Sequence, residues 1–173
     1  MGEAGQPEGL RHSPAVLRGK STIFAAFAAV FVLFVAVPAA FAAHRSTTSL
    51  GLLQAVNAAR KAYGLQPLRL DPTLTQAAQA HTSDMLRRDY FAHGNFPGRM
   101  AAFHVSGRTA GENLAWGSGD YGRAAEVVRE WLASPEHRAN LLGAAFSRIG
   151  IGLARGTFLG TGDATVVTAD FAG

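Results

Sequence analysis

The hydrophobic pattern divides the chain into an apolar segment near the N-terminus and a longer region in which apolar and polar positions repeat regularly. Residues 23–43 form an unbroken run of 21 apolar residues, and the polar segment before them carries a net positive charge. Pro38 lies near the end of the run, and Ala40-Phe41-Ala42 then fits the small-residue pattern of a signal-peptide cleavage site. A basic start, an apolar run and a small-residue exit are typical of an export signal.

The same run is long enough to cross a bilayer once as a helix, so two fates are open. Residues 1–43 are predicted to be a signal peptide, and an uncleaved membrane anchor is the alternative. Residues 44–49 then form a short polar linker, and residues 50–173 form the folded domain. In both cases we expect an extracellular or cell-surface domain whose contact with the membrane is limited to the N-terminal segment.

Beyond the linker, helical periodicity comes first. Apolar side chains recur at a spacing of three or four residues in three places: Leu52, Val56, Ala59 and Tyr63; Leu74, Ala78, His81 and Met85; and Ala124, Val128 and Trp131. Asp71-Pro72 and Ser134-Pro135 each combine a capping residue with proline at the first helical position, which predicts two helix starts. The second of these starts opens a short fourth helix over 137–142. Residues 90–111 show no sustained period, so we expect a long loop there with at most one turn at 99–103.

Strand-like alternation appears only near the C-terminus. Ile149, Ile151 and Leu153 alternate with small residues, and a second alternating stretch covers residues 166–171. A glycine-containing loop over 156–163 is expected to join the two strands. Helices in one block and strands in another predict an α+β layered domain rather than a series of βαβ units.

Composition excludes several classes of protein. The chain has 173 residues, of which 48% are hydrophobic and 16% charged, so it is neither disordered nor a basic nucleic-acid-binding tail. It contains no cysteine, which rules out disulfide scaffolds, zinc–thiolate sites and cysteine nucleophiles. The formal net charge is +4, but the basic residues are scattered and form no stripe for phosphate contacts. We therefore expect no nucleic-acid partner.

Common enzyme signatures are absent or misleading. Residues 117–122 match G-x-G-x-x-G and precede a predicted helix. A dinucleotide site needs a strand before this motif and a parallel sheet around it, which the predicted elements do not supply. The segment is therefore interpreted as a glycine-rich loop. No G-x-S-x-G elbow, Walker A motif or H-E-x-x-H pair occurs, which argues against serine hydrolases and common zinc proteases.

Two of the histidines are candidates for function. His81 lies on the apolar stripe of the second helix and is interpreted as a half-buried, hydrogen-bonded residue, and His104 is expected at the surface. His93 lies in the long loop, whereas His137 lies in the first turn of the proline-started helix. A helix N-terminus disfavours the imidazolium, so His137 should be neutral and able to accept a proton or bind a metal. A purely structural histidine that bonds a neighbouring loop is an equally good interpretation.

Four segments together resemble a known family. They are, in order, Phe91-Ala92-His93, the G-E-N-L-A element at 111–115, the run from Trp131 to Leu142 with its S-P-E-H-R-A-N core, and the R-I-G-I-G element at 148–152. Their order and spacing resemble the CAP superfamily, the SCP-like extracellular domain of cysteine-rich secretory, antigen 5 and pathogenesis-related proteins. The chain is most similar to the short, cysteine-free bacterial branch, and the resemblance covers residues 50–173.

The resemblance implies a three-layer α-β-α sandwich with a central cleft in which two histidines and two acids converge. Carried over position by position, the first histidine is His93, the first acid is Glu112 and the second histidine is His137. In several family members this cleft holds a divalent metal such as zinc, which makes His93 and His137 the tentative ligands here. The second acid falls on Ser134, so the set is incomplete. Whether the neighbouring Glu136 replaces it is open, although a position at a helix start favours an outward orientation.

Two functions follow from these residues. The first, which we favour, is a monomeric, non-enzymatic module that binds a small apolar or cell-envelope ligand or interacts with an envelope or host partner. The alternative is a metal-assisted hydrolase of peptide or cell-envelope substrate, with His93 and His137 as ligands and Glu112 as base. Glu112 can equally be the hydrogen-bond partner that orients the histidines, which leaves only two metal ligands.

Asn113 and Asn140 are expected to be structural, because each follows a candidate residue where backbone groups need partners.

Overall fold

The computed structural model describes residues 47–173. The predicted export segment, residues 1–43, and the first half of the predicted linker, residues 44–46, lie outside the described residues. Within the described part, no helix combines the length and the hydrophobicity that a bilayer-spanning helix requires. The first helix, α1 (Ser49–Ala62), begins at the last residue of the predicted linker, and the Thr48 side chain caps it by accepting a hydrogen bond from the Gly51 amide. Helix α1 therefore begins within the predicted linker.

A mixed four-stranded sheet forms the centre of the domain, in the order β1-β3-β4-β2. These strands are β1 (Arg69–Leu70), β2 (Ala110–Ser118), β3 (Arg148–Phe158) and β4 (Thr161–Ala172). Only β1 pairs parallel to its neighbour; β3 with β4 and β4 with β2 are antiparallel. The two predicted C-terminal strands are thus confirmed, but they are longer than expected and are joined by a two-residue turn at Leu159 and Gly160, both with positive φ.

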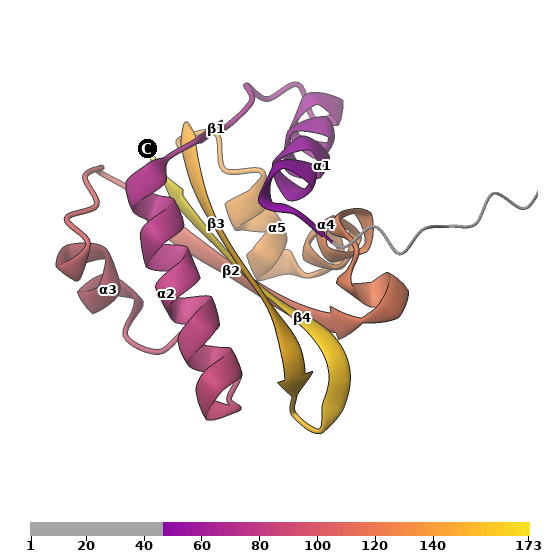
Figure 1. Ribbon diagram of the computed structural model, residues 1–173. Coiled ribbons are helices and arrows are strands. Elements are labelled where there is room, and N and C mark those ends of the chain that lie inside the picture. Colours follow the sequence, from indigo (N-terminus) through magenta and orange to yellow (C-terminus); the bar gives the residue numbers. More distant parts are fainter. Residues whose placement is uncertain (1–46) are drawn as a thin grey trace, which may run out of the picture. The chain divides into compact units, whose positions relative to one another are not determined.

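Helices cover both faces of this sheet (Figure 1). On one face lie α1, α4 (Ala124–Ala133) and α5 (Pro135–Leu141), whose apolar side chains pack with those of β3 and β4 around Trp131. On the other face lie α2 (Pro72–Arg88) and α3 (Phe96–Ala102), which pack on the sheet through Leu74 and Met100. The predicted α+β layered arrangement is confirmed.

Two glycines of β3 set the distance between α2 and the sheet. A Cβ atom at Gly150 would lie 2.1 Å from the backbone of Leu74, and one at Gly152 would lie 2.4 Å from the carbonyl oxygen of Ala78. The alternating Ile149 and Ile151 side chains point into the core on the opposite face. The R-I-G-I-G element therefore packs isoleucine on one face and leaves room for a helix backbone on the other.

The segment predicted as one long loop is more structured than expected. It contains α3, which begins where the Asn95 side chain accepts a hydrogen bond from the Gly98 amide. Its last residues open β2, a strand that alternation did not reveal because it mixes glycines with buried polar side chains. A strand therefore does precede the glycine-rich motif, which continues into a 3-10 turn at Gly119–Gly122. A dinucleotide-binding motif follows a strand of a parallel sheet. Strand β2 pairs antiparallel with β4, so the motif at residues 117–122 is not a dinucleotide-binding site.

The predicted helix starts hold, with one correction. Asp71 caps α2 by accepting hydrogen bonds from the amides of Thr73 and Leu74, at 2.8 and 3.0 Å. Helix α5 begins at Pro135 as expected, but the Ser134 side chain makes no capping hydrogen bond. The prediction of a serine cap is therefore wrong, and the Ser134 side chain lines a cleft instead.

Candidate functional site

The centre of the site is Glu112, a buried acid on β2. Its side chain is 2% exposed and comes from the edge strand of the sheet. His93, from the loop between α2 and α3, places its Nδ1 atom 2.7 Å from the Glu112 Oε1 atom. The His93 side chain is 55% exposed, so the ring is largely open to solvent apart from its Nδ1 atom, which bonds Glu112. This hydrogen bond brings together two residues that were singled out from the sequence.

His137 reaches the same region from the other helical layer. It lies in the first turn of α5, and its carbonyl oxygen accepts a hydrogen bond of 2.9 Å from the Asn113 side chain on β2. Burial lowers the pKa of His137, and the nearby His93 lowers it further, so the ring is neutral at physiological pH. The neutral form was expected from the helix start, but burial is its main cause. Because β2 is the edge strand, side chains from both helical layers can approach one another around it.

Two charged residues that sequence reasoning missed complete the buried part of the site. Arg99, on α3, forms an ion pair with the Glu112 carboxylate, and its Nη2 atom lies 3.9 Å from the Asp170 Oδ1 atom. Asp170, on β4, is completely buried and lies directly opposite Glu112 in the pairing of β2 with β4. A second acid, Asp170, therefore lies beside Glu112, at a position other than Ser134.

Burial and charge act in opposite directions on this pair of acids. Burial raises the pKa of the Glu112 carboxyl and of the Asp170 carboxyl, and the negative charge of Glu112 raises that of Asp170 further. The Arg99 guanidinium opposes both shifts. One guanidinium compensates one carboxylate, so the pair retains a proton at neutral pH.

His81 supports the loop that carries His93. Its Nε2 atom bonds the carbonyl oxygen of Ala92 at 3.0 Å and lies 4.0 Å from the Glu112 Oε2 atom. Burial lowers the pKa of His81 to about 4, so this ring is neutral as well. The prediction of a buried, hydrogen-bonded His81 is confirmed, and His104 is exposed as expected.

Glu136 does not join the buried acids. It lies exposed in the first turn of α5 and is not among the residues that line the cleft. Its charge slightly raises the pKa of His137, against the larger effect of burial. The acid that lies beside Glu112 is therefore Asp170 and not Glu136.

The residues present do not form a three-ligand zinc site that includes Glu112. Within residues 47–173, no group of three or more histidine, aspartate or glutamate side chains is arranged to hold a metal ion. The Glu112 carboxylate is engaged, because its two oxygens face His93 and Arg99. A three-ligand site would require this carboxylate to be free.

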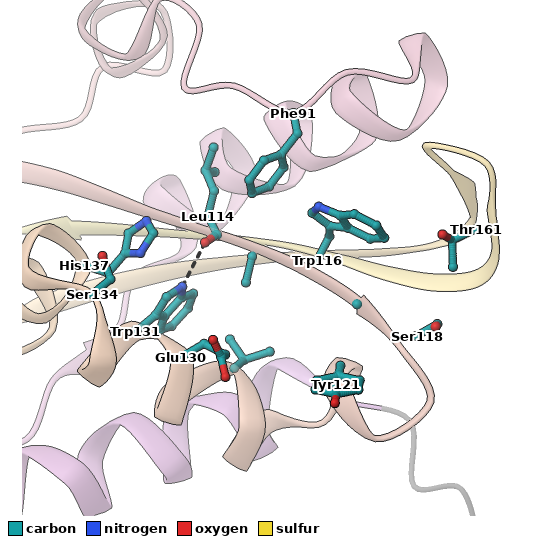
Figure 2. Close-up of a pocket in the computed structure, with 13 residues that line it drawn as sticks. Phe91, Leu114, Trp116, Ser118, Tyr121, Glu130, Trp131, Ser134, His137 and Thr161 are labelled. Carbon is teal, nitrogen blue, oxygen red and sulfur yellow. Dashed lines mark hydrogen bonds between the residues drawn. The ribbon is translucent and has the colours of Figure 1, made fainter.

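A cleft of about 640 Å³ follows the outer edge of β2 (Figure 2). His137 and Ser134 lie at one end, and Ser118 and Thr161 lie at the other. The walls are mainly apolar and aromatic, and they are formed by Phe91, Leu114, Ala115, Trp116, Gly117, Tyr121, Val127, Glu130 and Trp131. The Trp131 Nε1 atom donates a hydrogen bond of 2.9 Å to the Leu114 carbonyl oxygen, which fixes the wall to the strand.

This fold and this site define a class. An α+β domain with a loop histidine, a buried strand glutamate and a helix-start histidine beside an edge-strand cleft is a CAP-type domain. The CAP family, described as the cysteine-rich secretory protein family, matches residues 53–171, and the chain belongs to it. Despite the family's name, this chain has no cysteine.

Relatives of the chain include bacterial and plant proteins. It is 39% identical to the Bacillus subtilis (strain 168) protein YkwD over 106 residues, which are 58% of this chain and 40% of that protein. It is 34% identical to the membrane protein YlbC of the same organism over 116 residues, or 64% of this chain and 33% of that protein. Against pathogenesis-related protein 1C of Nicotiana tabacum, identity is 31% over 97 residues, or 56% and 51% of the two chains. The chain thus spans about half or less of these relatives.

Solved structures agree on the fold. An extracellular SCP-domain protein from Bacillus anthracis str. Ames superposes with a TM-score of 0.60 at 26% identity, over 70% of this chain and 38% of that one. An outer surface protein from Borrelia burgdorferi gives a TM-score of 0.57 at 24% identity, over 69% and 87% of the two chains. By their descriptions, the Bacillus anthracis protein is extracellular, the Borrelia burgdorferi protein is an outer surface protein and YlbC is a membrane protein.

Proposed function

We propose that this domain is an exported, monomeric, non-enzymatic module that binds a small apolar or cell-envelope ligand in the cleft beside β2. The observation that carries the proposal is the cleft itself. Its volume of about 640 Å³ falls within the range of pockets that enclose small ligands, and its walls are mainly apolar and aromatic. His137 and Ser134 supply polar groups at one end, where they can orient a ligand.

Export is supported by two independent observations. The apolar run at residues 23–43 is typical of an export segment, and the homologues are extracellular, surface or membrane proteins. An exported domain meets envelope lipids, glycans and peptides before it meets cytoplasmic metabolites, which favours a cell-envelope ligand.

The alternative, a metal-assisted hydrolase, has less support. It requires Glu112 to act as a ligand or base, whereas the Glu112 carboxylate is engaged by Arg99 and His93. The remaining argument for it is the pair of histidines, since burial keeps His137 neutral and able to accept a proton. Hydrolysis of a peptide or peptidoglycan substrate that is lost in His137→Ala would favour this alternative.

Ligand binding can be measured through the protein's own fluorescence. Both tryptophans of the chain, Trp116 and Trp131, line the cleft. Titration with oleate and with a soluble peptidoglycan fragment should therefore change tryptophan emission in a saturable way for one of them. Tyr121→Ala, in the cleft wall, should weaken binding, whereas Tyr63→Ala, an exposed tyrosine outside the cleft, should not. No saturable change with either probe, or equal effects of the two variants, would count against the proposal.

A further inference from the structure

The cation at the centre of the buried acids is provided by the chain itself. The Arg99 guanidinium pairs with Glu112 and lies 3.9 Å from Asp170, and the Arg99 side chain is only 11% exposed. Its Nη1 atom also donates to the carbonyl oxygen of His93 at 3.4 Å. Arg99 thus contacts both buried acids and the loop that carries the first histidine.

The fold fixes this guanidinium in place. Helix α3 is anchored at its start by the Asn95 cap and at its centre by the buried Met100. The Arg99 guanidinium also lies 5.5 Å from the centre of the Phe96 ring, a cation–π contact within the same helix. These contacts restrict the arginine more than a surface ion pair would.

We propose that Arg99 is the resident cation of this site: it compensates Glu112 and Asp170 in place of a divalent metal and holds Glu112 as the residue that orients His93. This inference does not depend on which ligand the cleft binds. An ionised Glu112 accepts a hydrogen bond from a protonated Nδ1 of His93, which leaves the His93 Nε2 atom free as an acceptor. Arg99 is therefore a positioning residue that acts through Glu112.

Electrostatics explains why a metal is at a disadvantage here. Two buried carboxyl groups without a cation would be costly. The Arg99 guanidinium forms an ion pair with Glu112 and places its positive charge 3.9 Å from the Asp170 Oδ1 atom, which has no hydrogen-bond partner of its own. A divalent ion would have to displace Arg99 and leave that charge buried without its partner. Without the guanidinium, Glu112 and Asp170 would be neighbouring carboxyl groups with the His93 ring beside Glu112, and carboxylate oxygen and imidazole nitrogen are donors that zinc accepts.

The test is a calorimetric titration of zinc chloride into the purified full-length chain and three variants. Arg99→Met keeps most of the apolar stem and removes the charge, and it should bind zinc about tenfold more tightly than the wild type or better. Arg99→Lys keeps the charge and should resemble the wild type. Arg87→Ala, an exposed arginine on α2, is the matched control and should change nothing. If Arg99 is purely structural, the Met and Lys variants should both be destabilised to the same extent, and neither should gain affinity for zinc.

Two outcomes would overturn the proposal. The first is a folded Arg99→Met variant, checked by circular dichroism, whose zinc affinity equals that of the wild type. The second does not require that variant to fold: wild-type protein that binds zinc near stoichiometrically and loses it in Glu112→Gln would show that a metal, not Arg99, is the partner of Glu112. Weak wild-type binding that is unchanged in Glu112→Gln supports the proposal.

Discussion

Glu112 lies directly opposite Asp170 in the antiparallel pairing of β2 with β4, and both side chains are buried on the face of the sheet that α2 and α3 cover. Two like charges this close cannot both ionise without strong compensation. A single guanidinium, that of Arg99, provides it from α3. The stability of the folded domain should therefore depend on the protonation of this pair.

The first prediction concerns stability at alkaline pH. Because burial raises the pKa of both carboxyls, the folded protein retains a proton that the unfolded chain releases above about pH 4. The stability that this proton provides is lost as the pH rises through the folded-state pKa values. His81 has the opposite effect on stability, because burial lowers its pKa to about 4 in the folded protein. This contribution no longer changes with pH above about pH 6.5, where the imidazole is neutral in the unfolded chain as well. The free energy of unfolding should therefore fall between pH 7 and 9.

Urea denaturation across this pH range measures the effect. Asp170→Asn should flatten the dependence, because the amide mimics the protonated acid and does not titrate. Asp163→Asn is the control, since that aspartate is exposed near the start of β4. A wild-type stability that stays constant from pH 7 to 9 would contradict the prediction.

The second prediction concerns Asn140, which connects α5 to β2. Its Nδ2 atom donates to the Glu112 carbonyl oxygen and to the Asn113 Oδ1 atom, each at 3.0 Å. Asn140→Ala removes both bonds and should cost about 1–3 kcal/mol of stability. Thermal or urea unfolding tests this, with Gln76→Ala, an exposed residue of α2, as control. Melting at the wild-type temperature would show that Asn140 is not structural.

The sequence predicted the elements whose side chains repeat regularly and missed those that depend on the surrounding fold. Helices α1, α2 and α4 and the pair β3–β4 all follow periodic apolar patterns. Strand β2 has no such pattern, because Glu112 and Asn113 are polar and buried at once. Their partners lie on other elements, far away in the sequence, so local propensity could not identify the strand.

The sequence likewise predicted some residues of the candidate site and missed others. His93, Glu112 and His137 came from motif resemblance, and the structure places a hydrogen bond between the first two. Arg99 was missed because its segment was read as a loop and a single arginine carries no signal. Asp170 did carry a signal in the sequence, because an acid within a mainly apolar predicted strand needs a buried partner.

The third prediction concerns the contact between α2 and the sheet. In Gly150→Ala, the new Cβ would lie 2.1 Å from the backbone of Leu74, which a side-chain rotation cannot relieve. Helix α2 would have to move away from β3, at a cost of about 3 kcal/mol or more, on the scale of overpacked cores. Gly162→Ala is the control, because nothing lies within 4 Å of a Cβ at Gly162. Equal unfolding midpoints for the two variants would refute this account of the R-I-G-I-G element.

The last prediction concerns the N-terminal segment, which lies outside the described residues. If Ala40-Phe41-Ala42 is a cleavage site, the mature protein begins at Ala43 and is found in the extracellular fraction. Small side chains are required at the first and third positions of such a site, whereas the middle position is tolerant. Ala42→Arg should therefore block processing and keep the full-length chain in the membrane fraction, resistant to high salt and released by detergent. Phe41→Leu, the matched control, should be processed normally. N-terminal sequencing of both fractions decides the matter, and wild-type protein recovered only at full length from membranes would establish an anchor instead.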